Sequence, residues 1–206
     1  YKLASGRGGR LQAHDPLTAS EWLVIPSLDA GKQDGRIFLA AAITPEEISD
    51  LFQEKLIHQD EVFWDGKVGR VVSRRVIRLG ELILKEQPLA EPPPEALEQA
   101  LVAGIREQGL SVLHWSTPAR MLQARLLFLR QWQPEGNWPD VAEQALLDTL
   151  EDWLPPYLVG MRSLKECARL KMEEILLARL DFQQQQRLNR DAPTHLQVPS
   201  GSRIRL

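Results

Sequence analysis

The sequence predicts an α+β protein, in which a small β-barrel with one inserted helix precedes an α-helical domain and a terminal β-hairpin. Three observations support this fold class. Short apolar runs alternate with turns from Tyr1 to Leu89, as in all-β domains with short strands. After residue 94 the spacing of the apolar residues becomes helical. Glu91-Pro92-Pro93-Pro94 separates the two regions, and consecutive prolines favour an extended linker over residues 91–94.

Apolar runs between turn residues predict the strands of residues 1–90. These strands are expected at Trp22–Ile25, Arg36–Ile43, Val62–Trp64, Val68–Ile77 and Leu82–Leu84. Asp65-Gly66 separates two of the runs, and both residues tolerate the positive φ angles of a type I′ turn. We therefore expect a tight antiparallel hairpin at this point.

One helix is expected within the strand series. Thr44-Pro45-Glu46-Glu47 has the pattern of a capping box with proline at the first helical position, and it predicts a helix that runs to about Leu56. A closed five-stranded barrel with a helix between its third and fourth strands is typical of an oligonucleotide-binding (OB) fold. Residues 1–90 are therefore interpreted as an OB-fold-like barrel.

Residues 95–191 are predicted to form a helical domain, because potential caps and helix-ending residues alternate with helical apolar spacing. The expected helices are Glu95–Gln108, Pro118–Trp132, Asp140–Leu154, Leu164–Arg179 and Asp181–Arg190. The capping residues include Ser116 and the Ser163 to Glu166 box, and Pro155-Pro156 ends the third helix.

The second of these helices carries an apolar stripe that predicts a buried face. Leu122, Leu126 and Leu129 recur at helical spacing, with Phe128 and Trp132 nearby, and we expect all of them in the core.

Residues 192–206 are expected to be a β-hairpin, because Ala192-Pro193 returns the chain to an extended conformation. This hairpin is interpreted as the start of a truncated further segment. The chain begins with Tyr1 and not with methionine, which indicates an excised piece of a longer protein.

Composition excludes several classes of protein. The single cysteine, Cys167, rules out an intrachain disulfide, and the four histidines lack metal-ligand spacing, so we expect no metal site and a reducing, cytoplasmic compartment. The longest apolar run, Ile37–Ile43, is about a third of the length needed to span a bilayer. The net charge is only −3, so nucleic acid would have to bind to local basic patches.

The densest basic patch lies in the predicted hairpin. Residues 67–78 contain five basic and no acidic residues, and Arg70, Arg74 and Arg78 share one face of a strand. Two more arginines lie in a glycine-rich turn near the N-terminus. The predicted nucleic-acid-binding residues are Arg7, Arg10, Lys67, Arg70, Arg74, Arg75 and Arg78. The alternative is a solvated strand face, with glycines that only permit tight turns.

Other features of the chain allow both a functional and a structural interpretation. Aromatic residues of the barrel could stack on bases, although we expect most of them in the core, with Trp64 beside the turn the most open to solvent. Arg120, Arg125 and Arg130 form either a second basic surface or ordinary surface ion pairs. The stretch from Gln131 to Met161 has six acidic and no basic residues, so it either faces a basic partner or is plain surface.

Catalytic motifs are missing from the sequence. It contains no G-x-x-x-x-G-K-[ST] phosphate loop, no G-x-S-x-G elbow and no H-E-x-x-H zinc motif. We therefore expect no catalytic residue and no bound cofactor in this chain, and we do not expect it to hydrolyse a nucleotide by itself.

Several short motifs, in order, resemble the C-terminal region of bacterial DEAH-box helicases of the HrpB type. They are Gly9-Arg10-Leu11, Glu21-Trp22-Leu23-Val24, Gly69-Arg70-Val71, Arg78-Leu79-Gly80-Glu81-Leu82, Trp138-Pro139-Asp140, Ala192-Pro193-Thr194-His195 and Val198-Pro199-Ser200-Gly201-Ser202-Arg203. The resemblance implies an accessory region of an ATP-dependent helicase that acts on RNA, with ATP and Mg²⁺ bound only by motor domains outside this sequence.

Two functions follow from the resemblance. The barrel holds single-stranded nucleic acid, most simply RNA, beside the motor domains, or it docks on the motor or on a regulatory protein without binding nucleic acid. Phosphate contacts would weaken steeply with salt, whereas apolar docking would not.

Overall fold

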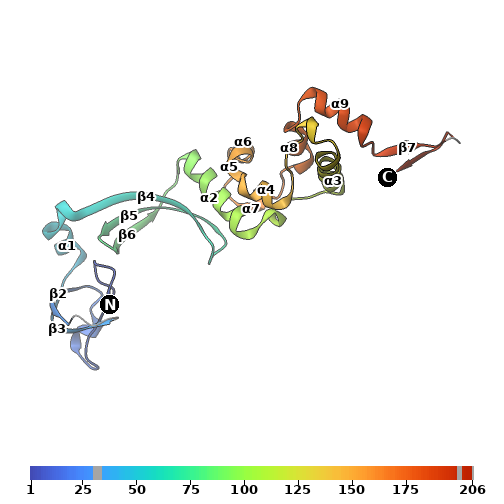
Figure 1. The fold of residues 1–206 in the computed structure, drawn as a ribbon. Coiled ribbons are helices and arrows are strands. Elements are labelled where there is room, and N and C mark those ends of the chain that lie inside the picture. Colours follow the sequence, from blue (N-terminus) through green and yellow to red (C-terminus); the bar gives the residue numbers. More distant parts are fainter. Residues whose placement is uncertain (30–33, 199–200, 206) are drawn as a thin grey trace. The chain divides into compact units, whose positions relative to one another are not determined.

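The structure is a computed structural model that describes residues 1–29, 34–198 and 201–205, and it confirms the α+β class. The chain divides into two compact units. Unit 1 comprises Tyr1–Val62 and Ser73–Pro92, and unit 2 comprises Phe63–Val72 and Pro93–Leu206. Unit 1 contains most of the strands and unit 2 most of the helices (Figure 1).

The first sheet of unit 1 has the strand order β1-β3-β2. Its strands are β1 (Gly8–Arg10), β2 (Leu23–Leu28) and β3 (Asp34–Ala42). Strand β1 pairs with β3 in parallel, and β2 pairs with β3 antiparallel. The β2 register shifts between Val24 and Ser27, a segment that contains Pro26, which has no N–H to donate to a neighbouring strand.

The second sheet has the order β4-β5-β6 and is built from consecutive antiparallel strands. They are β4 (Leu56–Asp65), β5 (Arg70–Leu79) and β6 (Leu82–Pro88). The register of β6 covers only Arg74–Leu79 of β5. The half of the β4–β5 hairpin nearest its turn therefore has no third strand.

The expected closed barrel is not what the described residues form. They contain two separate three-stranded sheets, and neither is closed by hydrogen bonds to the other. Strand β1 is only three residues long and pairs with the first residues of β3, and β4 and β5 continue beyond β6 as a long hairpin. The edge strands of the two sheets therefore do not pair, as a closed barrel requires.

Helix α1 (Pro45–Leu51) begins as the sequence predicts. The Thr44 side chain accepts a hydrogen bond from the Glu47 amide, and the Glu47 carboxylate accepts one from the Thr44 amide. The helix ends earlier than expected, because a 3₁₀ turn over Gln53–Lys55 leads directly into β4 at Leu56. The N-terminal turn is also a hairpin, with Lys2 bridged to Gly8 and Gly6 at φ +84°.

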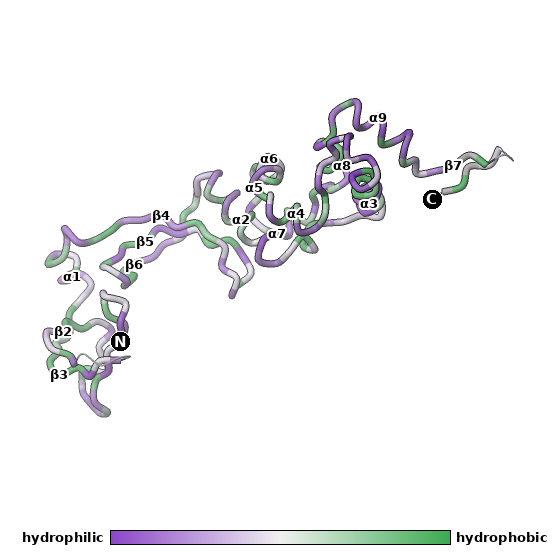
Figure 2. The backbone as a smooth tube through the Cα atoms, viewed as in Figure 1, coloured by the Kyte–Doolittle hydropathy of each residue, from purple (hydrophilic) through white to green (hydrophobic). Residues whose placement is uncertain are grey.

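Unit 2 contains helices α2 to α9. They are α2 (Pro94–Gln108), α3 (Thr117–Trp132), α4 (Glu143–Asp148), α5 (Leu150–Trp153), α6 (Pro155–Leu158), α7 (Leu164–Cys167), α8 (Met172–Ala178) and α9 (Phe182–Asp191). Hydrophobic residues recur along α2 and α3, whereas α9 is mostly hydrophilic (Figure 2).

Two of the predicted helices are each broken into two. The expected helix over Asp140–Leu154 is interrupted at Thr149, whose hydroxyl donates a hydrogen bond to the Ala145 carbonyl, a contact that bends helices. The expected helix over Leu164–Arg179 is interrupted because Lys171 takes an extended backbone conformation.

Leucines from most of the helices, with other apolar residues, form the core of unit 2 and confirm part of the predicted stripe. Leu122, Leu126 and Leu129 are buried. Phe128 and Trp132 were expected beside them but are 53% and 66% exposed, because they lie on the outer side of α3. Cys167 is also buried, which raises the pKa of its thiol to about 11 and keeps it protonated.

The chain ends with β7 (His195–Gln197) paired antiparallel to β8 (Arg203–Arg205), so the predicted C-terminal hairpin is confirmed. Three residues of that predicted segment, 199, 200 and 206, lie outside the described residues. Among the described residues, no helix is both long enough and apolar enough to cross a membrane.

Candidate nucleic-acid interface

The β4–β5 turn presents the tip of the predicted basic hairpin. The hairpin is confirmed, but its turn is longer than the expected two residues, since β4 ends at Asp65 and β5 starts at Arg70. The Asp65 carboxylate accepts hydrogen bonds from the amides of Lys67 (2.9 Å) and Val68 (3.2 Å). The amide of Gly69, at φ +73°, donates to the Asp65 carbonyl at 2.7 Å and closes the turn.

The tip belongs to unit 2, where it packs on helix α2. Trp64 lies against Gly104, and a Cβ atom at residue 104 would come within 2.7 Å of the indole ring. Val71 packs against the helical core, and the Glu107 carboxylate lies over Gly66. Trp64 is thus an anchor of the hairpin and not the aromatic residue most open to solvent, as was expected. Among the aromatic residues of the predicted barrel, Phe38 is the most exposed, at 61%.

Three of the predicted phosphate ligands are engaged in ion pairs within unit 1. Arg74 donates to Glu61 at 2.8 Å and to Glu86 at 2.8 Å, and Arg78 also donates to Glu61. Arg75 forms a bidentate pair with Asp60 at 2.6 and 2.8 Å. The basic residues of β5 are conspicuous in the sequence, but the carboxylates of β4 that face them were not predicted.

The ion pairs shift the pKa values of their carboxyl groups. Burial favours the protonated form of Glu61, but the hydrogen bonds from Arg78 and Arg74 outweigh it and hold the pKa of Glu61 below its usual range. The hydrogen bond from Arg75 lowers the pKa of Asp60. These carboxylates are ionised at neutral pH, so they neutralise much of the charge of β5.

The remaining predicted ligands are more accessible. Lys67 and Arg70 are exposed, and no ion-pair partner for either is found within residues 1–29, 34–198 and 201–205. Arg7 is exposed in the N-terminal hairpin, and Arg10, 78% exposed, pairs with Asp34 at 3.3 Å. A nucleic-acid role for all seven residues stays a prediction.

The arginines of α3 have structural contacts in unit 2. Arg120 stacks on the Trp115 ring at 4.1 Å, and Arg130 pairs with Asp140 at 3.1 Å. Arg125 donates to the carbonyls of Ala192 (2.5 Å) and Leu188 (3.1 Å), which lie at the C-terminal end of α9. Desolvation lowers the pKa of Arg125, although arginine remains charged at neutral pH.

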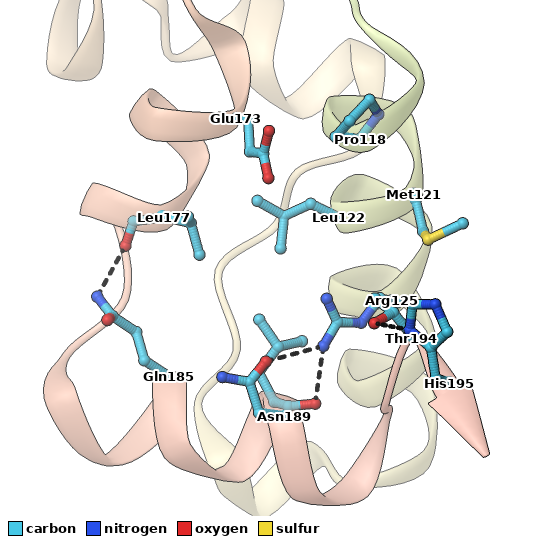
Figure 3. A pocket seen from close by; sticks show the side chains of 11 residues that line it. Pro118, Met121, Leu122, Arg125, Glu173, Leu177, Gln185, Asn189, Thr194 and His195 are labelled. Atoms are coloured by element: carbon cyan, nitrogen blue, oxygen red, sulfur yellow. Dashed lines mark hydrogen bonds between the residues drawn. The ribbon is translucent and has the colours of Figure 1, made fainter. Parts of the chain in front are cut away.

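A cleft of about 420 Å³ lies beside Arg125, between α3, α8 and α9 (Figure 3). Met121 and Leu122 line it from α3, and Glu173 lines it from α8. The Arg125 guanidinium points toward Asn189 of α9, where its hydrogen bonds are satisfied by protein groups. Because Arg125 is already engaged and Glu173 is acidic, this cleft is a poor phosphate site.

The described residues offer no grouping of three or more histidine, cysteine, aspartate or glutamate side chains that could hold a metal ion. The sequence also lacks a phosphate loop. Binding of ATP and Mg²⁺ by motor domains outside this sequence stays an expectation.

Comparison with known sequences places these elements in a family. The "ATP-dependent RNA helicase HrpB, connector region" family matches residues 58–89, which include β4, β5 and β6. The "ATP-dependent helicase C-terminal" family, HrpB_C, matches residues 153–206. ATP-dependent RNA helicase HrpB of Escherichia coli K12 is 41% identical over 99% of the chain. The chain belongs to the HrpB family.

The chain spans 26% of the length of that curated HrpB relative. Two crystal structures of E. coli HrpB, described as a DExH-box NTPase and as a DEAH/RHA helicase, are similar to the whole chain. Their identities are 40% and 37%, and each has a TM-score of 0.56 and is covered over 26% of its length. The shared region of HrpB therefore includes both units.

Proposed function

We propose that this region of an HrpB protein holds single-stranded RNA for motor domains that lie elsewhere in the longer helicase chain, in the bacterial cytoplasm. ATP and Mg²⁺ would bind to those motor domains. The observation that carries the proposal is the β4–β5 turn, which presents Lys67 and Arg70 to solvent on a hairpin anchored by Trp64. The relative's description as an RNA helicase supports RNA as the ligand.

The proposal divides the seven predicted ligands by their surroundings. Lys67 and Arg70 contact phosphates directly, because no carboxylate in the described part of the chain pairs with them. Arg74, Arg75 and Arg78 chiefly hold the sheet together. Releasing Arg75 to a phosphate would leave Asp60 without its partner, and releasing Arg74 or Arg78 would remove one of the two guanidinium groups that share Glu61. Arg7 and Arg10 are a separate candidate contact within unit 1.

The test is the affinity of the chain for a fluorescently labelled single-stranded RNA, measured by anisotropy at low and moderate salt. We expect salt-sensitive binding in the micromolar range, since backbone contacts of this kind are weak and sequence-independent. The double substitution Lys67→Glu and Arg70→Glu should weaken binding at least about tenfold. It should also reduce the slope of log K against log salt by roughly 1.4, as for two lost contacts to a single strand.

The matched control is the double substitution Lys165→Glu and Arg169→Glu, which makes the same charge change at two exposed residues of unit 2. The control should bind nearly as tightly as the unaltered chain. Equal weakening by both double variants would show that net charge alone matters and would contradict a contact site at the hairpin tip.

The second candidate is a protein-docking module, and the exposed acidic residues of unit 2 favour it. Glu143, Asp148, Glu151 and Asp152 are all exposed, and a shallow groove of about 420 Å³ lies between α2 and Glu151. If the chain does not bind RNA even at low salt, docking on the motor or on a basic regulatory protein becomes the better account.

A further inference from the structure

The outer side of helix α3 carries two exposed aromatic rings. Phe128 and Trp132 are 53% and 66% exposed, although rings of this size are normally buried. They lie four residues apart on one side of the helix, with ring centroids 6.3 Å apart and planes tilted by 44°. The two rings therefore form a small platform, which we call the α3 aromatic pair.

Helix α3 itself carries positive charge on the same element as the pair. Helix α3 contains three arginines and no acidic residue over Thr117–Trp132. Arg125 donates to carbonyl and amide oxygens, which leave its charge in place. Arg130 is 48% exposed, but Asp140 partly neutralises it. The helix thus brings aromatic rings and positive charge together on one element.

Along α3, the exposed apolar surface is limited largely to the two rings. The neighbouring outward residues Ala124 and Gln131 are small or polar, and both are exposed. A standard protein interface involves about 20–30 residues on each side. Two rings match the size of one or two nucleobases, and stacking on aromatic side chains needs no particular base sequence.

We propose that the α3 aromatic pair is a second contact for single-stranded nucleic acid, at which one or two bases stack on Phe128 and Trp132. This inference rests on the proposed function and deepens it, because it adds a base contact in the helical unit to the phosphate contacts of the hairpin tip. The contact is tolerant of sequence and depends on the bases.

The experiment compares two labelled single strands of equal length and phosphate number, one a normal RNA and the other with abasic sites throughout its middle. The unaltered chain should bind the normal strand about tenfold more tightly, within the usual effect of base stacking. The double substitution Phe128→Ala and Trp132→Ala should remove this preference and leave binding to the abasic strand and its salt slope unchanged.

A matched control truncates two other exposed apolar side chains of unit 2. Phe182 and Val159 are 74% and 71% exposed, so Phe182→Ala with Val159→Ala truncates two exposed apolar side chains that do not belong to α3. This variant should keep the preference for the normal strand. Circular dichroism of each variant checks that the helical unit stays folded.

The outcomes separate this inference from the proposed function. If Lys67→Glu with Arg70→Glu weakens binding but the α3 double variant retains its preference for bases, the inference is overturned and the proposed function stands. If the unaltered chain binds neither strand, both are overturned. If it forms a dimer in sedimentation that the α3 substitutions dissociate and shows no preference for bases, the pair is a protein contact and the inference fails.

Discussion

Glu61 is the residue that decides how much of the basic strand is available to a ligand. Its side chain is only 12% exposed and accepts hydrogen bonds from both Arg74 and Arg78. Two guanidinium groups share one carboxylate, and Glu86 supplies a further contact to Arg74. The charge that makes β5 conspicuous in the sequence is therefore largely used to join β4, β5 and β6.

Substitution Glu61→Gln should destabilise unit 1 by about 1–3 kcal/mol at pH 7, between the values for surface and buried ion pairs. The matched substitution Glu86→Gln should cost less, because Glu86 is 60% exposed and, among the described residues, its one ion pair is with Arg74. The measurement is urea unfolding followed by the amide NMR signals of β4, β5 and β6. Equal effects of the two substitutions would contradict a central role for Glu61.

The effect of Glu61→Gln should also depend on pH. The pKa of Glu61 is lower in the folded state than its usual value of about 4.3, so its ionised form stabilises the fold above that value. This stabilisation is lost as the pH falls through the folded-state pKa. The difference between Glu61→Gln and the unaltered chain should therefore shrink steadily below about pH 4.

The paired carboxylates show why the sequence predicted the basic strand but not its neutralisation. Contacts between residues close together in the sequence were predicted correctly, as in the capping box of Thr44 and Glu47. The partners of Arg74 and Arg75 depend on the register between β4 and β5. The expected two-residue turn implies a different register, in which other residues lie opposite these arginines. Asp60 and Glu61 precede the end of β4 by as many residues as Arg75 and Arg74 follow the start of β5, so the pairing depends on strand ends that were not predicted.

At the scale of elements, the β4–β5 hairpin depends on a close approach to α2. Gly104 is buried in the interior of α2, where glycine is unfavourable for a helix, and the Trp64 ring occupies the space that a side chain would take. The same contact holds the tip that presents Lys67 and Arg70. Packing on α2 and display of the basic residues are therefore consequences of one arrangement.

Substitution Gly104→Val should destabilise unit 2 by about 1–3 kcal/mol, because overpacking against Trp64 outweighs the better helix propensity of valine. The control is Ala103→Val at the neighbouring exposed position of α2, which should change stability by less than about 0.5 kcal/mol. Thermal unfolding monitored by circular dichroism gives both values. The packing argument fails if the Gly104→Val variant is at least as stable as the Ala103→Val variant.

Elements whose ends are set by local residues were predicted better than those set by distant contacts. Helices α2, α3 and α9 were expected close to their observed bounds, whereas the helix over 140–154 was expected to be continuous because Thr149 is not in itself a helix breaker. Phe128 and Trp132 were expected in the core because they are hydrophobic and lie close to the apolar stripe of the helix. Hydrophobicity alone does not show where the buried face ends and the exposed face begins.

At the scale of the whole molecule, the two units differ strongly in the size of their hydrophobic cores. Among the described residues of unit 1, the apolar side chains at least nine-tenths buried are Ile37, Ile48 and Val76. Unit 2 buries a continuous cluster that extends from Leu101 in α2 to Leu188 in α9. Since burial of apolar surface is the main favourable term in folding, unit 2 should be much the more stable.

This difference predicts a contrast in hydrogen exchange. Amides in the interior of α2 and α3 should exchange at least about a hundredfold more slowly than those of β1, β2 and β3, because the strands open locally without unfolding the helical core. Mass spectrometry of peptides from the intact chain measures both. Slow exchange in β3 comparable to that in α3 would show that unit 1 is held by more than its own core, and would contradict the predicted order of stability.

Because β5 has residues in both units, its amide exchange should change along the strand. We expect slower exchange near Val71, which packs on the helical core, than near Arg78.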